Sequence, residues 1–442
     1  MASDAEEFIA VLRAGVWSKS AILRQGVWLT LIVLLCYRLG TYIPVPGVNA
    51  GFMHALLDEH RQDALGLQDA FTGGAVRRFS LFTLGITPYL TAVGLIRSAT
   101  PVIPFLARIK DLGLLGQQQL DRYVMYLAAV LALVSSYSVA IGLEGASNEF
   151  GPAVAHPGGW FRVTCALTLV AGTLLLSWMA RLIDQHGFGP GVVLVGTSGL
   201  FVTLPGAIAS LSGFGRPVGW PLYAVWCLLP GMVLAVALIV FFEQARRRIP
   251  IDMAKRQVGR RLFDVPRPGL PLRANPAGMS PSLSATSILL TPATLTGLLT
   301  AFPAVRAFVT GPLARGQPLY LLLYAAAVII LSFTVAAKQI DGSEIADRLR
   351  KGGQFIPGVR PGLQTADYIG RVRTRLVLPG AGYILALCVP LELLIGRFGL
   401  PDAFTGAALV GMVTLILEIV AQLDSVALSV RYEGLIRRPE HS

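Results

Sequence analysis

The sequence predicts an all-α polytopic membrane protein that crosses the bilayer about ten times. Of its 442 residues, 54% are hydrophobic and only 14% are charged, whereas a soluble domain carries about a quarter charged residues. The mean hydropathy of +0.64 agrees with this class. A helix needs about 20 apolar residues to cross the hydrocarbon core. The predicted spans are 26–44, 76–98, 123–144, 160–182, 190–212, 220–242, 276–298, 318–338, 376–396 and 403–430.

A basic stretch, 246–278, divides the chain into two halves and lies between two of these apolar runs. Basic loops of this kind stay on the cytoplasmic side of a membrane. This loop either only orients the chain or also docks a large, partly anionic partner. The predicted parts are a cytoplasmic segment 1–25, a first half 26–212, a second half 213–430 with basic loops 243–275 and 339–375, and a tail 431–442.

The distribution of charge predicts the orientation. The segments on one side of the predicted spans carry most of the 37 Lys and Arg, so we expect both termini in the cytoplasm. Residues 3–17 either form a helix on the inner surface or are a disordered tail. The first residues, MASDAEEF, lack the basic region and short apolar core of a cleavable signal peptide.

Several spans are expected to be irregular. Pro88, Pro205 and Pro281 interrupt the second, fifth and seventh spans, which is tolerated where neighbouring helices or water satisfy the freed carbonyl groups. The segment 45–75 is too polar to span and too apolar to be an ordinary loop. We expect it to fold back between the helices from the extracytoplasmic side.

The residue types and their spacing do not predict an active site. The five histidines do not cluster, and the four cysteines lie inside apolar runs, so neither a metal site nor a disulfide framework is expected. We predict no catalytic residue and no cofactor. The glycine-rich stretch 187–191 lacks a preceding strand, and Asn275-Pro276-Ala277 occurs once where a water channel needs two such starts. A coupled transporter would need a carboxylate near the midplane, for which Glu418 is the candidate, but we favour a structural role for it as a snorkelling or paired carboxylate.

The second basic loop has a distinctive tip. Its sequence GGQFIPGVRPGLQTADYI, residues 352–369, holds Arg360 between two Pro-Gly pairs. Such spacing predicts a turn of defined shape, and a charge presented there suits contact with a partner, although a solvated loop tip is the alternative.

At these residues the chain resembles the SecY family, the channel subunits of the Sec protein translocase. The likeness is colinear along nearly the whole chain. It rests on YRLGTYIPVPGVN (37–49), FTGGAVRRFSLFTLGITPYLTA (71–92), GFGPGVVLVGTSGLFVTLPGAI (187–208), RRRIPIDMAKRQVGRR (246–261), LPLRANPAGMSPS (270–282), the 352–369 loop and AQLDSVALSVRYEGLI (421–436).

The resemblance implies two inverted five-helix halves around an hourglass pore, with a lateral gate between spans 2–3 and 7–8. It implies SecE-like and SecG-like subunits, and a SecA ATPase or a ribosome as the driving partner. The docking residues it implies are Lys255, Arg256, Arg260, Arg261 and Arg360, of which Arg260 and Arg261 match the ribosome-contact pair.

The resemblance also implies the residues that close the pore. A plug at about 63–71 includes Leu65, Gly66, Leu67 and Phe71. The aliphatic ring that narrows the pore is Ile86, Leu90, Gly196, Leu200, Leu283 and Gly411. Because two of the six are glycine, either this ring is looser than usual or Val195 and Val410 take those two places.

We therefore expect a protein-conducting channel in a bacterial plasma membrane. It would pass unfolded preproteins across and release signal sequences or transmembrane segments sideways into lipid. The alternatives are a secondary transporter, a non-conducting scaffold, and a divergent accessory member of the SecY family. An intramembrane enzyme is the least favoured reading.

Overall fold

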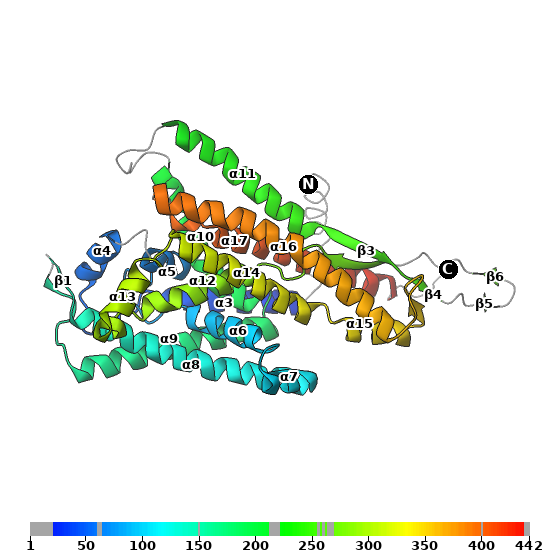
Figure 1. Cartoon of the computed structure of the whole chain (residues 1–442), viewed down its shortest axis with the longest axis horizontal. Helices are drawn as coiled ribbons and strands as arrows, with labels where there is room; N and C mark the ends of the chain where they lie inside the picture. The colour runs from blue at the N-terminus through cyan, green and yellow to red at the C-terminus, as the bar shows by residue number, and fades with distance from the viewer. Residues whose placement is uncertain are drawn as a thin grey trace.

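The computed structural model is an elongated bundle of helices with short strands at both ends (Figure 1). It describes residues 21–59, 64–148, 151–211, 222–253, 257–258, 261–262, 269–398 and 401–436. The first half contributes α3 (Ala21–Gly40), α4 (Ala50–Glu59), α5 (Ala64–Thr72), α6 (Thr87–Ala99), α7 (Pro104–Asp111), α8 (Leu114–Glu144), β1 (Ser147–Asn148), β2 (Gly151–Pro152), α9 (Gly159–His186) and α10 (Gly191–Leu211).

The second half has a similar run of long helices. It contributes α11 (Leu222–Gln244), β3 (Arg246–Pro250), β4 (Asp252–Met253), β5 (Gln257–Val258), β6 (Arg261–Leu262), β7 (Gly269–Arg273), α12 (Ser280–Thr294), η1 (Leu298–Ala301), α13 (Pro303–Thr310), α14 (Pro318–Gln339), α15 (Gly342–Lys351), β8 (Gln354–Phe355), α16 (Leu363–Phe398), η2 (Asp402–Phe404) and α17 (Gly406–Ile436).

The all-α polytopic class is confirmed. Within the part of the chain that the structure describes, a helix coincides with each of the ten predicted spans: α3, α6, α8, α9, α10, α11, α12, α14, α16 and α17. Among the described residues, six helices are long and apolar enough to cross a membrane. By contrast, α6 and α12 have only 13 and 15 residues, fewer than the roughly 20 that a full crossing needs.

The role predicted for two of the prolines was wrong. Pro88 and Pro281 lie in the first turns of α6 and α12, so they begin these helices instead of interrupting them. Proline is favoured there because the first helical N–H groups have no partner within the helix. Pro205 does lie inside α10, as predicted. The two short helices are the second spans of their halves, and discontinuous helices in corresponding positions are typical of repeat-built channels and transporters.

The two basic loops meet in one folded unit at the end of the bundle. Strand β3 pairs antiparallel with β7, and β4 pairs with β8 from the second loop. A small core joins them to α15 and α16; it contains Ile249, Ile251, Leu272, Ile340, Leu349, Ile356, Ile369, Val372 and Leu376. We call the unit of β3, β4, β7, β8, α15 and the start of α16 the basic platform. The sequence predicted the two loops but not their strands.

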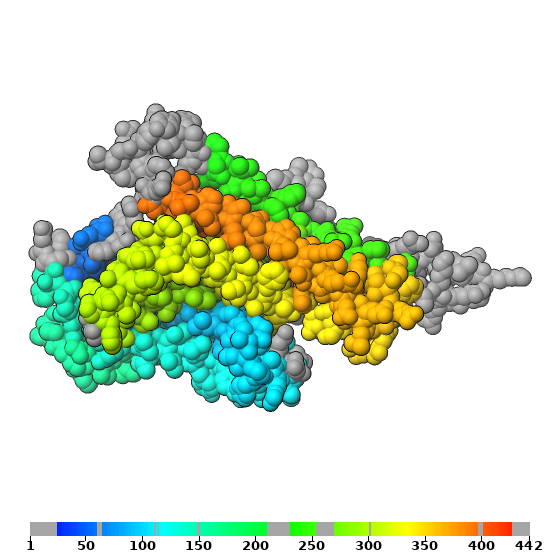
Figure 2. All heavy atoms as spheres, viewed as in Figure 1, coloured from blue at the N-terminus to red at the C-terminus, as the bar shows by residue number. Residues whose placement is uncertain are grey.

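The two halves pack face to face. Helix α6 contacts α12 and α14, and α10 contacts α17. In Figure 2, α6 and α8, in blue and cyan, lie directly below α14 and α16, in yellow and orange. Helix α5 lies between the halves, because it packs both on α10 and on η2. The segment 45–75 thus places one of its helices back in the bundle.

Candidate functional site

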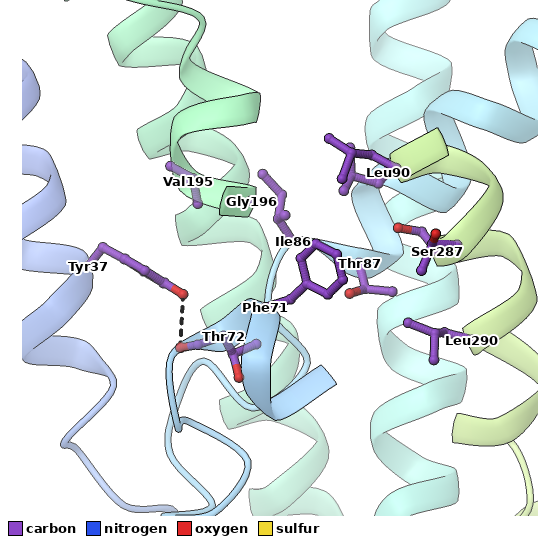
Figure 3. Close-up of a pocket in the computed structure, with 13 residues that line it drawn as sticks. Tyr37, Phe71, Thr72, Ile86, Thr87, Leu90, Val195, Gly196, Ser287 and Leu290 are labelled. Atoms are coloured by element: carbon purple, nitrogen blue, oxygen red, sulfur yellow. Dashed lines mark hydrogen bonds between the residues drawn. The ribbon is translucent and has the colours of Figure 1, made fainter. Parts of the chain in front are cut away.

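Side chains from α3, α5, α6, α10 and α12 enclose a small cavity between the halves (Figure 3). Its volume of about 20 Å³ leaves room for about one water molecule. Four of the six predicted ring residues line it. The lining residues are Tyr37, Phe71, Thr72, Gly85, Ile86, Thr87, Leu90, Val195, Gly196, Leu283, Thr286, Ser287 and Leu290. Hydroxyl groups in this lining come from Tyr37 and from short Ser and Thr side chains, and its walls are otherwise mostly apolar.

Gly196 faces the other ring residues directly. A Cβ placed on it would lie 3.5 Å from Ile86 Cγ2 and 4.0 Å from Leu90 Cδ1, which is ordinary van der Waals contact. The neighbouring Val195 also lines the cavity, and it belongs to the same core as Ile86. Both residues of α10 therefore reach the cavity, and Gly196 as the ring position stays a prediction.

Gly411 occupies a tighter place. A Cβ placed on it would lie 3.0 Å from Thr197 Cγ2 of α10 and 3.7 Å from Leu283 Cδ2 of α12. The missing side chain therefore lets α17 approach α10 closely, and Thr197 fills the space. Leu200, the remaining predicted ring residue, is fully buried in the same core as Leu283.

Helix α5 carries the predicted plug residues. Leu67 is fully buried, Leu65 and Phe71 are partly buried, and Gly66 is buried. Figure 3 shows the Phe71 ring beside Ile86 and Thr87, directed into the cavity. The approach to α10 is close, because a side chain at Gly199 would overlap the backbone of Phe71. Helix α5 thus covers the cavity from the side opposite the basic platform, as expected of the predicted plug.

Hydrogen bonds from a tyrosine and two arginines hold the C-terminal end of α5. The Tyr37 hydroxyl donates a hydrogen bond of 3.1 Å to the Thr72 carbonyl. The Gly73 carbonyl accepts from Arg38 Nη1 at 2.7 Å and from Arg78 Nη2 at 3.1 Å. Cations near a helix C-terminus are favoured by the helix dipole. Gly73 has a φ of +67°, a conformation that glycine adopts without strain, so the chain can turn directly after α5.

The contact between α6 and α12 is rich in hydroxyl groups. Thr91 and Thr291 share a hydrogen bond of 3.1 Å across it. Gly94 permits close packing, since a Cβ there would lie 2.9 Å from Ile288 Cδ1. Sequence reasoning missed this feature, although the run of Ser and Thr in 280–294 is a visible signal for it.

The Asn275-Pro276-Ala277 stretch anchors the start of α12. Asn275 is buried, and its Nδ2 donates to Glu243 Oε1 at 2.7 Å and to the Gly278 carbonyl at 3.0 Å. The Tyr383 hydroxyl of α16 also donates to Glu243 Oε1. The base of α12 is therefore fixed to α11 and α16.

Of the predicted docking residues, Arg360 is described in full. It is exposed at the tip of its loop, and its carbonyl accepts a hydrogen bond of 2.9 Å from Thr365 Oγ1. The buried side chain of Ile356 anchors the same loop in the platform core. Arg261 begins strand β6. Lys255, Arg256 and Arg260 lie outside the described residues, as do the segment 3–17 and residue 63 of the predicted plug.

Glu418 does not stand alone in the bundle. Its carboxylate lies 3.9 Å from Arg273 Nη1 of the basic platform, and both side chains are partly exposed. The pairing agrees with the structural role that we favoured for Glu418 over a transport role.

A buried ion cluster lies beside the plug, and sequence reasoning missed it. Arg315 Nε contacts Glu392 Oε2 at 2.9 Å, and Arg315 Nη1 contacts Asp402 Oδ1. The three side chains are 4%, 3% and 9% exposed. The cluster joins the start of α14, the end of α16 and η2.

Comparisons with known proteins agree with this geometry. The family model described as SecY matches residues 80–420. The protein translocase subunit SecY of Escherichia coli (strain K12) is 37% identical over 419 residues, covering 94% of this chain and 94% of the relative. The corresponding subunit of Rickettsia felis is 34% identical over 409 residues, covering 92% and 94%.

Solved structures share the fold. One, described as the structure of a protein conducting channel, has a TM-score of 0.62 at 17% identity and covers 95% of each chain. A second, concerned with the plug domain of SecY and the closed state of the channel, has a TM-score of 0.61 at 16% identity. With a family model matched over most of its length and relatives more than 30% identical along nearly all of it, the chain belongs to the SecY family.

Proposed function

We propose that this chain is the protein-conducting channel of a Sec translocase in a bacterial plasma membrane. It passes unfolded preproteins across the membrane and releases signal sequences and transmembrane segments sideways into lipid. The observation that carries the proposal is the cavity of about 20 Å³ between the halves, lined by Ile86, Leu90, Gly196 and Leu283 and covered by Phe71 of α5.

The chemistry of the cavity suits a conduit. Apolar side chains touch a passing polypeptide without binding it strongly, so the chain can move on. An empty, mostly apolar constriction of this size has room for about one water molecule, which limits ion flow when no substrate is present. The plug adds a second seal, because Phe71 lies against the same space. No binding group for a nucleotide is needed, since the energy comes from a partner.

The seam between α6 and α12 is the proposed lateral gate. It is held by packing and by the Thr91–Thr291 hydrogen bond, and one such bond contributes only about 1 kcal/mol. A weakly held seam can open when an apolar segment inserts. Such a segment of about 20 residues is then more stable in lipid than in the pore. The fixed base of α12 at Asn275 lets the rest of the helix move about that point.

The basic platform is the proposed docking surface, with both termini on the same, cytoplasmic side. Exposed arginines on β3, β7 and α16 suit a SecA ATPase or a translating ribosome, and SecE-like and SecG-like subunits brace the bundle. Arg260 and Arg261 form part of the ribosome patch. Replacing both with Glu should abolish ribosome binding in a sedimentation assay titrated with salt, because phosphate contacts are strongly salt-dependent. Unchanged binding with an unchanged salt slope would indicate that this loop only orients the chain in the membrane.

A divergent accessory role is the second candidate, and the two ring glycines favour it. The two roles differ in whether the chain supports general secretion. Expression of this chain in a bacterium depleted of its own SecY would restore growth if the chain is a primary channel. An accessory channel would fail to restore growth while still moving a restricted set of substrates.

The proposal is tested by reconstitution. The chain is purified with its SecE-like partner and inserted into liposomes with SecA, ATP and a radiolabelled preprotein. A channel yields preprotein that becomes protected from external protease in an ATP-dependent manner. A variant with Arg360→Glu serves as a control with an intact pore. Absence of protection by the wild-type complex, with SecA bound and hydrolysing ATP, would contradict the proposal.

A further inference from the structure

Among the described residues, Arg315 is the cation of the buried cluster described above, and it faces two carboxylates. It follows α13 in the chain, whereas Glu392 lies near the end of α16 and Asp402 begins η2. All three side chains are nearly inaccessible to solvent. One residue therefore neutralises acidic groups from two other segments. Loss of one partner from such a buried cluster is strongly destabilising, because it leaves charge uncompensated.

The cluster is also incompletely hydrogen-bonded. Among the described residues, the buried Arg315 Nη2 and the buried hydroxyl of Tyr320 have no hydrogen-bond partner. Most buried polar groups in proteins are satisfied, so unsatisfied ones need an explanation. A cluster that only fastened the fold together would gain from completing these bonds. An incomplete cluster is easier to separate and suits a contact that must break.

One side of the cluster supports the plug. Asp402 is the first residue of η2, and α5 packs against η2. The next two residues, Ala403 and Phe404, are buried in a small core with Ala207 and Met232. Thr405 then caps α17 by accepting a hydrogen bond from the Ala408 N–H. The Asp402 contact thus determines where the surface beneath the plug lies.

The other side of the cluster leads to the gate helix. From α12 the chain runs through η1 and α13 to Arg315, and α13 packs against both α12 and η1. Motion of α12 away from α6 would displace α13 and pull on Arg315. The same residue therefore connects the gate seam to the support of the plug.

We propose that the Arg315–Asp402 contact is a latch that couples the gate to the plug, so that opening of the α6–α12 seam withdraws Arg315 and frees η2 beneath α5. This inference rests on the proposed channel function. Arg315 acts here as a positioning residue: it touches neither the pore nor the substrate, and it holds the surface against which the plug closes.

The test measures the closed channel in two ways. Ion leak is measured in planar bilayers without substrate. Plug exposure is measured by labelling a cysteine at Leu67, which is fully buried in the closed channel, with a membrane-impermeant maleimide in a background without native cysteines. Arg315→Gln should raise both the leak and the labelling rate by about tenfold or more, because two buried carboxylates are then left without a positively charged partner.

Two further variants make the test specific. The neutral triple variant Arg315→Gln, Glu392→Gln, Asp402→Asn should return leak and labelling to near the wild-type values, because its amide side chains can still hydrogen-bond across the contact and no buried charge remains uncompensated. Arg162→Gln is the matched control: it breaks the 2.6 Å ion pair with Glu144 that joins α8 to α9. It should leave both readouts unchanged.

Each other outcome overturns the latch. A folded Arg315→Gln variant that neither leaks nor labels would show that the plug does not depend on this contact. Equal effects of Arg162→Gln would indicate general destabilisation. A triple variant that leaks as much as Arg315→Gln would also contradict the charge argument. A signal peptide added to the wild-type channel separates the two proposals: if it opens a conductance while Arg315→Gln stays closed, the latch is wrong and the channel function stands.

Discussion

Gly411 of α17 lies so close to Thr197 of α10 that a Cβ on the glycine would be 3.0 Å from the threonine methyl group. The corresponding Cβ on Gly196 would be 3.5 Å from Ile86 and would fit without displacement. The two ring glycines are therefore not equivalent: one leaves open space beside the pore, and the other brings two helices together.

This difference gives a prediction for the seal. Deleting residues 64–70 should produce a large ion leak, because the plug helix is then absent and Gly196 leaves the ring short of a side chain. Adding Gly196→Ile should suppress that leak in planar bilayers. Gly411→Ile should instead destabilise the folded protein by about 1–3 kcal/mol, the usual effect of overpacking, measured by thermal unfolding. Equal behaviour of the two isoleucine variants would contradict this assignment of the ring.

The position of the turn that follows α5 should depend on Arg78. Its bond to the Gly73 carbonyl is charge-assisted but only partly buried, so we expect Arg78→Gln to weaken plug closure by about 1 kcal/mol. The measurement is the rate at which a cysteine at Leu67 is labelled. Arg77→Gln is the control, because Arg77 pairs with Asp58 on the exposed surface, where ion pairs contribute little. Faster labelling in Arg77→Gln than in Arg78→Gln would show that the Arg78 bond does not hold this turn.

The exposed tip of the second basic loop should be needed by the motor. Arg360→Glu should block SecA-driven translocation in proteoliposomes while the protein still folds and inserts, because charge reversal at a docking contact typically costs several kcal/mol. Arg371→Glu tests a second exposed arginine near the start of α16 and should have a smaller effect. Translocation at the normal rate by the Arg360→Glu channel would remove this residue from the docking surface.

Acid should tighten the closed channel. Burial raises the pKa of Asp402, opposed by Arg315, and the carboxylates of Glu392 and Asp69 add to the rise. Burial also raises the pKa of Asp69, opposed by hydrogen bonding to the backbone of Arg77. A carboxyl with a higher pKa in the closed state binds its proton more tightly there than in water. The protonated carboxyl therefore stabilises the closed state fully at a pH below its ordinary pKa of about 3.9. This stabilisation is lost as the pH rises through the raised pKa of the closed state.

The leak should therefore fall as the pH on the extracytoplasmic side is lowered from about 7 toward the ordinary carboxyl pKa of about 4. Asp402→Asn should keep the plug seated, because the amide Oδ1 can still accept a hydrogen bond from Arg315, and it should reduce the pH dependence to the part that Asp69 contributes. A leak that increases on acidification, or an unchanged pH profile in Asp402→Asn, would contradict the predicted direction of the pH effect.

Much of the architecture follows from hydropathy, since apolar runs of membrane length predict helices wherever they occur. The prolines show where such reasoning ends: Pro88 and Pro281 were expected to interrupt spans, and they begin short helices instead. Hydropathy measures the apolar length of a segment, and it does not tell whether the whole segment is helical. The strands of the basic platform were missed for a similar reason, because β4 and β8 pair across segments far apart in the chain.

The candidate site divides in the same way. The resemblance selected Ile86, Leu90, Gly196 and Leu283 by position, and the structure brings all four to one cavity. The Arg315–Asp402 contact could not be predicted, because its partners are 87 positions apart in the sequence and three helices lie between them. Glu392 was visible as a rare carboxylate within a span, yet its partner depends on how loops pack at the end of the bundle.

The most direct test of the channel is where a translocating chain passes. A photoreactive amino acid is placed at Leu90 or Leu283 of the predicted ring, and, as a control, at Val33 of α3, which is buried but does not line the cavity. A preprotein arrested during transit is then irradiated in the reconstituted complex. We predict crosslinks to the arrested chain from Leu90 and Leu283 and none from Val33. Efficient translocation with no crosslink from the ring positions would contradict the proposal that substrates pass through this cavity.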